Sequence, residues 1–444
     1  MTTFERGTSK PAGIGELTLP DGRPGVVVRL RECPVCGLLQ RLPPLPRGAV
    51  AQCSRCGAVL RRRRVDPVGR SLALALTGLL LFAFAVALPF IDINAAGREN
   101  ATLLLTGPLE LRKYGLWELA VVVLVTSVGA PLARLLGLTY VLLGMHLRHP
   151  PRHLYALFRW VEWLRSWSMV EVFLLGVFAA YTRLAATAQV DLGGAVYALA
   201  GVMVAMVAAD GVLDREAVWK TLERKGVLAG RAEEPATHYN DNSRLTGCHY
   251  CGLVSRARMA CPRCGAIVRP RKTDSLQRTW AMLLTAAMLY VPANTMPILT
   301  LVEIGHSGAP STLFRGIRDI ATSGYWWLAV LVFFASIIVP LFKLLALSVL
   351  LITTQRGTPG WLRERTLIYR VVDSIGRWSM IDVFMVSILT ATARMGRLGS
   401  VFPGLGAVAF CAVVVLTMLA AHSFDSRLMW DAAMRNQRSA QARR

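Results

Sequence analysis

Hydrophobic and polar residues occur along this chain in long blocks. Uncharged apolar runs of bilayer length recur, and residues 71–91 form the clearest of them. A helix of that length crosses a hydrocarbon core of about 30 Å at about 1.5 Å per residue. The blocks predict eight membrane-spanning helices in two sets of four, the others beginning near residues 116, 167, 195, 277, 325, 378 and 405.

Two shorter segments between the spans have a single apolar face. Apolar residues at i, i+3, i+4 and i+7 indicate a helix with one buried side. Because their other positions are largely polar, both segments are expected to lie in the membrane interface. The apolar positions are Leu157, Trp160, Val161 and Leu164 in the first segment, and Ile368, Val371, Val372 and Ile375 in the second.

One seven-residue stretch occurs twice, 211 residues apart, each time at the start of an apolar run. Trp167–Phe173 reads Trp-Ser-Met-Val-Glu-Val-Phe, and Trp378–Phe384 reads Trp-Ser-Met-Ile-Asp-Val-Phe, so five of seven positions are identical. Self-similarity at a fixed distance indicates a duplicated structural unit. With an even number of spans in each half, the two repeats are expected to be parallel.

Composition agrees with a membrane protein and indicates its orientation. Hydrophobic residues make up 54% of the 444 residues, and the mean hydropathy is +0.45. Most of the excess positive charge, +23 in total, flanks the spans on the N-terminal side of the membrane, so that side is predicted to be cytoplasmic. The run Arg61–Arg64 before the first span could contact nucleic acid, but attachment to the anionic leaflet is the simpler interpretation.

Eight of the nine cysteines form four Cys-x2-Cys pairs, and the pairs occur in two couples. Two such pairs can place four thiolates around one zinc ion, and a glycine after each pair permits the tight turn. Disulfides or unmetallated thiols fit neither this spacing nor a reducing compartment. We therefore predict two structural zinc ions in two ribbons, bound by Cys33, Cys36, Cys53 and Cys56 and by Cys248, Cys251, Cys261 and Cys264.

These features divide the chain into five parts. The predicted fold is an all-α polytopic membrane protein with two tandem four-helix repeats, each headed by a cytoplasmic four-cysteine ribbon. The parts are an N-terminal ribbon (1–70), repeat 1 (71–213), a linker with the second ribbon (214–276), repeat 2 (277–424) and a basic cytoplasmic tail (425–444).

Few charged residues lie within the predicted spans. An unpaired charge in lipid is costly, so we expect Arg134 to pair with Glu171, and Lys343 with Asp382. The first pair would mainly join two helices, because arginine stays charged. The second could respond to protons, because a buried lysine can lose its charge. Ser336 and Thr417 would belong to that network, although such hydroxyls more often serve helix packing.

The combination of two four-cysteine ribbons, four spans after each and the twinned Trp-Ser-Met-x-acid-Val-Phe motif resembles the paraquat-inducible protein A family. The resemblance runs from Cys33 to Trp430 and includes Pro297-Ile298. It implies a fold like that of tetraspanin-related subunits, with a small extracytoplasmic sheet in each repeat. The first half has Val86-Ala87-Leu88-Pro89 where the second has Asn294-Thr295-Met296-Pro297, so a role for the asparagine is expected only in the second half.

The resemblance also implies a function. The chain would be an inner-membrane subunit that loads or unloads phospholipid for a periplasmic tunnel made by an MCE-domain protein of the LetB or PqiB kind. A proton gradient acting through the second repeat is one candidate energy source, since no phosphate-binding loop occurs in the sequence.

Two other classes of function fit the sequence less well. A membrane-anchored regulatory module could use the ribbons to recruit a partner, but the ribbons lack interleaved aromatics, so no nucleic acid partner is expected. An enzyme is not expected, because no nucleophile, base and orienting acid come together in the sequence.

Overall fold

The computed structural model describes residues 29–442 except 44, 65, 96–97, 185–188, 231–244, 258, 303–309, 323, 325 and 393–399. Segment 1–28 of the predicted N-terminal part, the polar centre of the predicted linker (231–244) and Tyr325 at the expected start of the sixth span lie outside the described residues.

The first ribbon consists of two antiparallel hairpins, and a helical half follows it. The strands are β1 (Arg29–Glu32), β2 (Leu39–Leu42), β3 (Val50–Gln52) and β4 (Val59–Arg62). The half contains α1 (Pro67–Ala87), β5 (Ile91–Ala95), β6 (Arg98–Thr102), α2 (Thr106–Lys113), α3 (Trp117–Leu124), α4 (Ala130–Gly144), α5 (Leu154–Leu164), α6 (Val170–Leu184), β7 (Gln189–Leu192), α7 (Gly194–Val212) and α8 (Arg215–Arg224).

The second ribbon and the second half repeat this order of elements. The ribbon contains β8 (Leu245–Gly247) and β9 (Val254–Arg256). The half contains α9 (Ser275–Thr295), β10 (Leu299–Val302), β11 (Pro310–Ser311), α10 (Leu313–Thr322), α11 (Trp326–Phe333), α12 (Val339–Arg356), α13 (Leu362–Ile375), α14 (Ile381–Thr392), β12 (Ser400–Pro403), α15 (Leu405–Ser423) and α16 (Arg427–Ala442).

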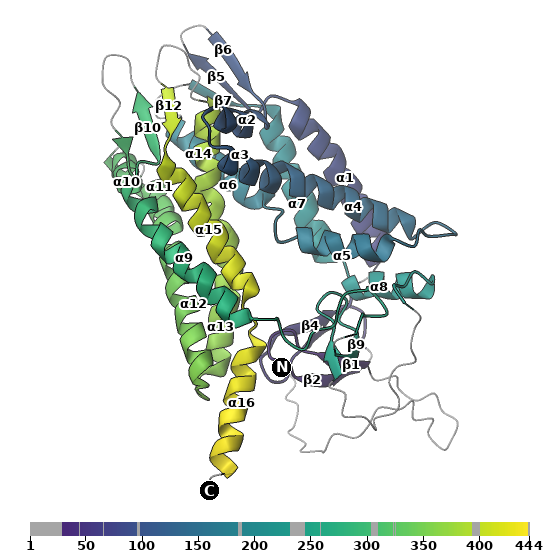
Figure 1. The fold of residues 1–444 in the computed structure, drawn as a ribbon. Helices are drawn as coiled ribbons and strands as arrows, with labels where there is room; N and C mark the ends of the chain where they lie inside the picture. Colours follow the sequence, from purple (N-terminus) through teal and green to yellow (C-terminus); the bar gives the residue numbers. More distant parts are fainter. Residues whose placement is uncertain are drawn as a thin grey trace, which may run out of the picture.

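Each half also has one small antiparallel sheet and one interrupted long helix. The strand orders β6-β5-β7 and β11-β10-β12 are equivalent, and both sheets lie at the end of the molecule opposite the ribbons (Figure 1). A π-helical turn precedes Pro131 at Val125–Gly129, and another precedes Pro340 at Phe334–Ile338. A proline lacks the N–H for the regular helical bond and crowds the preceding turn, which explains both interruptions.

Five helices are long and apolar enough to cross a membrane, counted over the described residues. They are α1, α3–α4 (Trp117–Gly144), α7, α11–α12 (Ala329–Arg356) and α15. Helix α6 is apolar but shorter. The prediction of a mostly helical protein with several apolar spans is therefore confirmed, while crossings by α6, α9 and α14 stay predictions.

The two copies of the twinned motif meet at the centre of the molecule. Helix α6 packs on α14, and the equivalent residues Phe173 and Phe384 stack edge to face with ring centroids 5.3 Å apart. Gly176 permits this approach, since a Cβ there would lie 2.9 Å from Phe384 Cβ. Both halves contribute to the apolar cluster around this contact.

The ribbons do not cover the halves that follow them in the sequence. The first ribbon shares an apolar cluster with α9, α12, α13 and α16, including Cys33, Leu283, Leu347, Val372 and Trp430. The second ribbon packs on α1, α4, α5 and α8, with Cys248, Ala75, Leu138, Phe158 and Trp219 in one cluster. Each ribbon precedes its repeat along the chain, but its apolar contacts are with the other half.

Three sequence expectations change in detail. Helices α5 and α13 exist, but α5 buries Leu154, Phe158 and Val161 and leaves Trp160 56% exposed. The residues taken as a tail form α16, whose Trp430 is buried against the first ribbon. Arg61, expected at the anionic leaflet, forms an ion pair with Glu216 of α8 at 3.1 Å.

Candidate functional site

Two groups of four cysteines have the geometry of metal sites. Within each group the Sγ atoms lie within 4.8 Å of one another, and seven of the eight residues are buried. The knuckle turns are formed by the backbone: Gly37, at φ 72°, donates to Cys33 O at 2.9 Å, and Gly252 and Gly265 do the same for Cys248 and Cys261. Four convergent thiols fit a tetrahedral metal ion, so both predicted ligand sets are brought together.

Equivalent arginines hold each ribbon to the opposite half. Arg159 of α5 donates to Cys264 O at 3.2 Å, and Arg370 of α13 donates to Cys56 O at 3.0 Å. The two arginines lie 211 residues apart, and each bonds to the fourth cysteine of a ribbon. The metal sites therefore lie directly against the two amphipathic helices.

A buried charge network joins the two ribbons and α16. The Glu32 carboxylate accepts from the backbone N–H of Gly247, and from Arg427 Nη1 at 3.1 Å and Arg271 Nη1 at 3.4 Å. Arg427, which is 1% exposed, also binds Asp425 at 3.1 Å. Although burial opposes the charged form, Arg427 holds the pKa of the Asp425 carboxyl below its usual range. Removing one member would leave a buried charge without its partner, which is costly.

Lys343 forms a polar site inside the second half. It lies on α12, three residues after Pro340, and its side chain is fully buried. The ammonium group donates to Thr417 Oγ1 of α15 at 3.2 Å and to Gly376 O at 3.3 Å. The structure thus places Thr417 beside Lys343, but the predicted ion pair between Lys343 and Asp382 is wrong, because carbonyl and hydroxyl oxygens hold the lysine instead.

Asp382 is buried in the same region without a bonded partner. Among the described residues, neither carboxylate oxygen accepts or donates a hydrogen bond, and Ser379 Oγ is likewise unbonded. Ser336, in the π-helical turn before Pro340, lies near Asp382 without a hydrogen bond between the two side chains. Its own hydroxyl proton goes to Val332 O at 2.6 Å, so its oxygen lone pairs remain open. A protonated Asp382 carboxyl could donate a hydrogen bond to one of these lone pairs.

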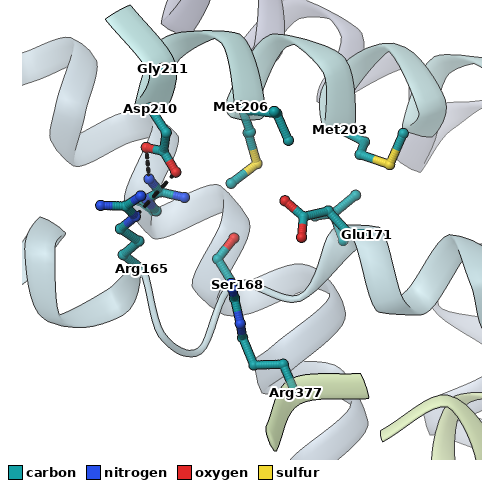
Figure 2. A pocket seen from close by; sticks show the side chains of 11 residues that line it. Arg165, Ser168, Glu171, Met203, Met206, Asp210, Gly211 and Arg377 are labelled. Atoms are coloured by element: carbon teal, nitrogen blue, oxygen red, sulfur yellow. Dashed lines mark hydrogen bonds and ion pairs between the residues drawn. The ribbon is translucent and has the colours of Figure 1, made fainter. Parts of the chain in front are cut away.

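A polar cavity of about 300 Å³ occupies the corresponding region of the first half (Figure 2). Apolar residues of α6 and α7 form part of its wall. The full lining consists of Arg134, Arg165, Ser168, Val170, Glu171, Met203, Met206, Val207, Asp210, Gly211 and Arg377. The motif residues Ser168 and Glu171 therefore face a cavity, whereas the equivalent Ser379 and Asp382 are enclosed by protein.

The predicted pair of Arg134 with Glu171 is wrong. Arg134 Nη2 binds Asp210 Oδ1, and Arg165 Nε contacts Asp210 Oδ2 at 3.3 Å (Figure 2). Asp210 takes the place expected for Glu171 because the end of α7 lies closer to the Arg134 side chain than the first turn of α6 does. Glu171 stays exposed at the start of α6, where the helix dipole stabilises a carboxylate.

Sequence reasoning missed several of these residues. Arg159, Arg165, Arg370 and Arg377 are not among the site residues predicted above, although the first and third repeat at the motif offset. Comparing the two halves position by position would have found that pair. Nothing local marks Glu32 or Arg427, which meet only in the folded protein.

Comparisons with known proteins agree with this arrangement. The profile of the family described as Paraquat-inducible protein A matches twice, over residues 68–223 and 276–434. Intermembrane transport protein PqiA of Escherichia coli (strain K12) is 34% identical over 400 residues, which cover 90% of this chain and 95% of that protein.

Two further relatives are similar over nearly their whole length. Lipophilic envelope-spanning tunnel protein A of Escherichia coli (strain K12) is 31% identical over 403 residues, 90% of this chain and 91% of the relative. A probable intermembrane transport protein of Haemophilus influenzae is 26% identical over 421 residues, 94% and 97% of the two chains. No solved structure matches the chain.

Proposed function

The chain belongs to the paraquat-inducible protein A family, and from that premise we propose that it is the inner-membrane subunit of a lipid transport system. It would load or unload phospholipid for a periplasmic tunnel built by an MCE-domain protein. The transport names of its relatives support movement of material between membranes, and the apolar helices support a multi-pass membrane location.

The proposed topology has eight spans in two parallel four-helix repeats, with both termini and both ribbons in the cytoplasm. Three observations support it: the matched order of elements, the paired match of the family profile, and the contact between equivalent phenylalanines. The small sheets would then face the periplasm, where the tunnel begins. The parts keep the predicted bounds 1–70, 71–213, 214–276, 277–424 and 425–444.

The metal bound by each four-cysteine group is proposed to be zinc. Zinc accepts four thiolates in tetrahedral geometry and has no redox chemistry of its own. Its role would be structural, because four thiolates complete the tetrahedral coordination and seven of the eight cysteines are buried. Each ion would fix the surface on which an amphipathic helix docks.

The observation that carries the transport mechanism is the buried polar set of the second half. Lys343, Thr417, Ser336 and Asp382 lie in the apolar interior, and Asp382 has no hydrogen-bond partner among the described residues. A carboxylate would be costly there, so we propose that Asp382 is neutral at rest and that Lys343 and Asp382 exchange protons during the transport cycle. The first-half residues Arg134 and Glu171 would have no such role.

The test is lipid transfer by the purified chain together with its MCE partner in proteoliposomes. Lys343→Met and Asp382→Asn are expected to lower the transfer of a fluorescent phospholipid at least about tenfold and to remove its dependence on an imposed pH gradient. Arg278→Met is the control, because Arg278 is an exposed cation in the first turn of α9, outside the network. Full transfer by Lys343→Met at normal protein level would show that the network does not drive transport.

A further inference from the structure

The first-half cavity has the composition of an anion site. Three guanidinium groups and two carboxylates line it, which leaves one positive charge in excess. Arg134 and Arg165 share the carboxylate of Asp210, and the nearby Glu162 carboxylate, which also acts on both, is paired with Arg215 at 2.7 Å. Counting that pair, the excess of one positive charge remains. Arg377 enters from the second half, and no hydrogen bond or ion pair of its side chain occurs within the described residues.

Resting on the proposed lipid transport, we propose that this cavity binds the headgroup of a glycerophospholipid, with Arg165 and Arg377 contacting its phosphate. Arginine suits this role because its planar fork of donors matches phosphate oxygens. Buried Arg134, which is 7% exposed, is held by Asp210 and forms the floor of the site.

Ser168 gives an independent indication of a ligand. Its hydroxyl is buried, lines the cavity and has no hydrogen-bond partner in the described part of the chain. Figure 2 shows the hydroxyl directed into the space between Arg165 and Glu171. A buried polar group without a partner costs free energy, and a phosphate oxygen would accept its proton.

Glu171 selects the kind of headgroup. Its carboxylate lies on the other side of the cavity from Arg165 (Figure 2), so the site presents cations and an anion to one ligand. A zwitterionic headgroup with a primary ammonium, such as phosphoethanolamine, matches that arrangement. An anionic headgroup such as phosphoglycerol would place no positive charge near Glu171.

The surroundings favour a lipid over a soluble phosphate. The volume, about 300 Å³, is at the small end of ligand pockets and suits a headgroup without its chains. Val207 lines the cavity and is still 50% exposed, and Val204 on the same helix is 61% exposed. Acyl chains could therefore continue along the outer apolar surface of α7.

The experiment measures binding by the full-length chain alone, purified in detergent, with native mass spectrometry. Short-chain dihexanoyl phosphatidylethanolamine and dihexanoyl phosphatidylglycerol are titrated separately, and inorganic phosphate is added as a competitor. Arg165→Gln and Arg377→Gln are expected to weaken binding of the ethanolamine lipid roughly tenfold each. Glu171→Gln is expected to remove the preference for ethanolamine over glycerol.

Arg278→Gln is the matched control, because Arg278 is an exposed cation in the first turn of α9, outside the cavity. Equal binding by wild type, Arg165→Gln and Arg377→Gln would overturn the proposal. If inorganic phosphate bound to the site as tightly as the ethanolamine lipid and displaced it, the assignment to a lipid headgroup would be overturned. This experiment measures binding without the transport partner, so Lys343→Met should bind the lipid like wild type. Headgroup binding would therefore stand even if the transport mechanism proposed for the second half failed.

Discussion

The two copies of the Trp-Ser-Met-x-acid-Val-Phe motif start equivalent helices but have different surroundings. In the first copy Ser168 and Glu171 face a polar cavity with three arginines. In the second copy Ser379 and Asp382 are buried, and neither side chain has a hydrogen-bond partner among the described residues. A shared local sequence therefore fixes where a helix begins, whereas its neighbours decide whether its acid meets water or protein.

Two positions on the fourth long helix of each half explain much of the difference. At the motif offset, Met206 and Asp210 of α7 correspond to Thr417 and Ala421 of α15. Asp210 gives Arg134 a carboxylate partner, and Ala421 gives Lys343 none. Lys343 instead donates to Thr417, which corresponds to Met206 of the cavity wall. One half is thereby built for a fixed charge and the other for a cation with neutral partners.

Metal removal should have the largest effect and should reveal the crossed docking of the ribbons. The apparent binding free energy of structural zinc in zinc-finger peptides is about 10–16 kcal/mol, so a ribbon that loses its metal is expected to unfold. Cys33→Ser with Cys36→Ser should raise hydrogen exchange in α13, and Cys248→Ser with Cys251→Ser should raise it in α5. Faster exchange in the half that follows each ribbon in the sequence would contradict the docking described above.

Loss of the Asp210 carboxylate should have the next largest effect. Asp210→Ala gives the first half the residue that the second half has, and it leaves Arg134 buried without its ion partner. We expect a loss of about 3–5 kcal/mol in the free energy of unfolding, measured by thermal or denaturant unfolding of the purified chain. Glu364→Ala, at an exposed position in the first turn of α13, is the control and should change little. An unchanged stability for Asp210→Ala would mean that Arg134 reaches another partner.

Substitution of the two motif serines should have the smallest effect on stability and should best distinguish the two copies of the motif. Neither hydroxyl has a hydrogen-bond partner in the described residues. Replacing such a group by hydrogen is expected to be neutral or slightly stabilising, within about 1 kcal/mol. Because Ser168 lines the cavity and Ser379 does not, Ser168→Ala should weaken lipid binding in the titration described above, while Ser379→Ala should leave it unchanged. A similar response of both variants would remove the distinction between the two copies.

Much of this organisation can be predicted from local sequence. The Cys-x2-Cys spacing indicates both metal sites, because a knuckle is a local turn whose ligands lie close in the chain. The apolar blocks predict the long helices, since length and hydropathy are properties of a single segment. Helices α2 and α10 are not predicted from the sequence, because each is short and directly follows a strand of a small sheet.

Ion-pair partners could not be predicted in this way. Arg134 and Lys343 were each expected beside the nearest motif acid, and both expectations were wrong. Helix ends are uncertain in a sequence, and a shift of one residue rotates a side chain by about 100°. The positions of α4 and α7, which both pack on α1, thus determine that Asp210 and not Glu171 meets Arg134.

The sequence by itself determined the repeated helices, the two sets of thiol ligands and the presence of buried charges, because each depends on composition or spacing within one segment. The tertiary structure alone decided that each ribbon docks on the opposite half, that the two motif copies meet through Phe173 and Phe384, and that one copy opens to a cavity. The ribbon docking and the phenylalanine contact join residues more than 100 positions apart, and the Arg134–Asp210 pair at the cavity joins residues 76 positions apart. Such contacts are set by the packing of whole helices, which no local pattern specifies.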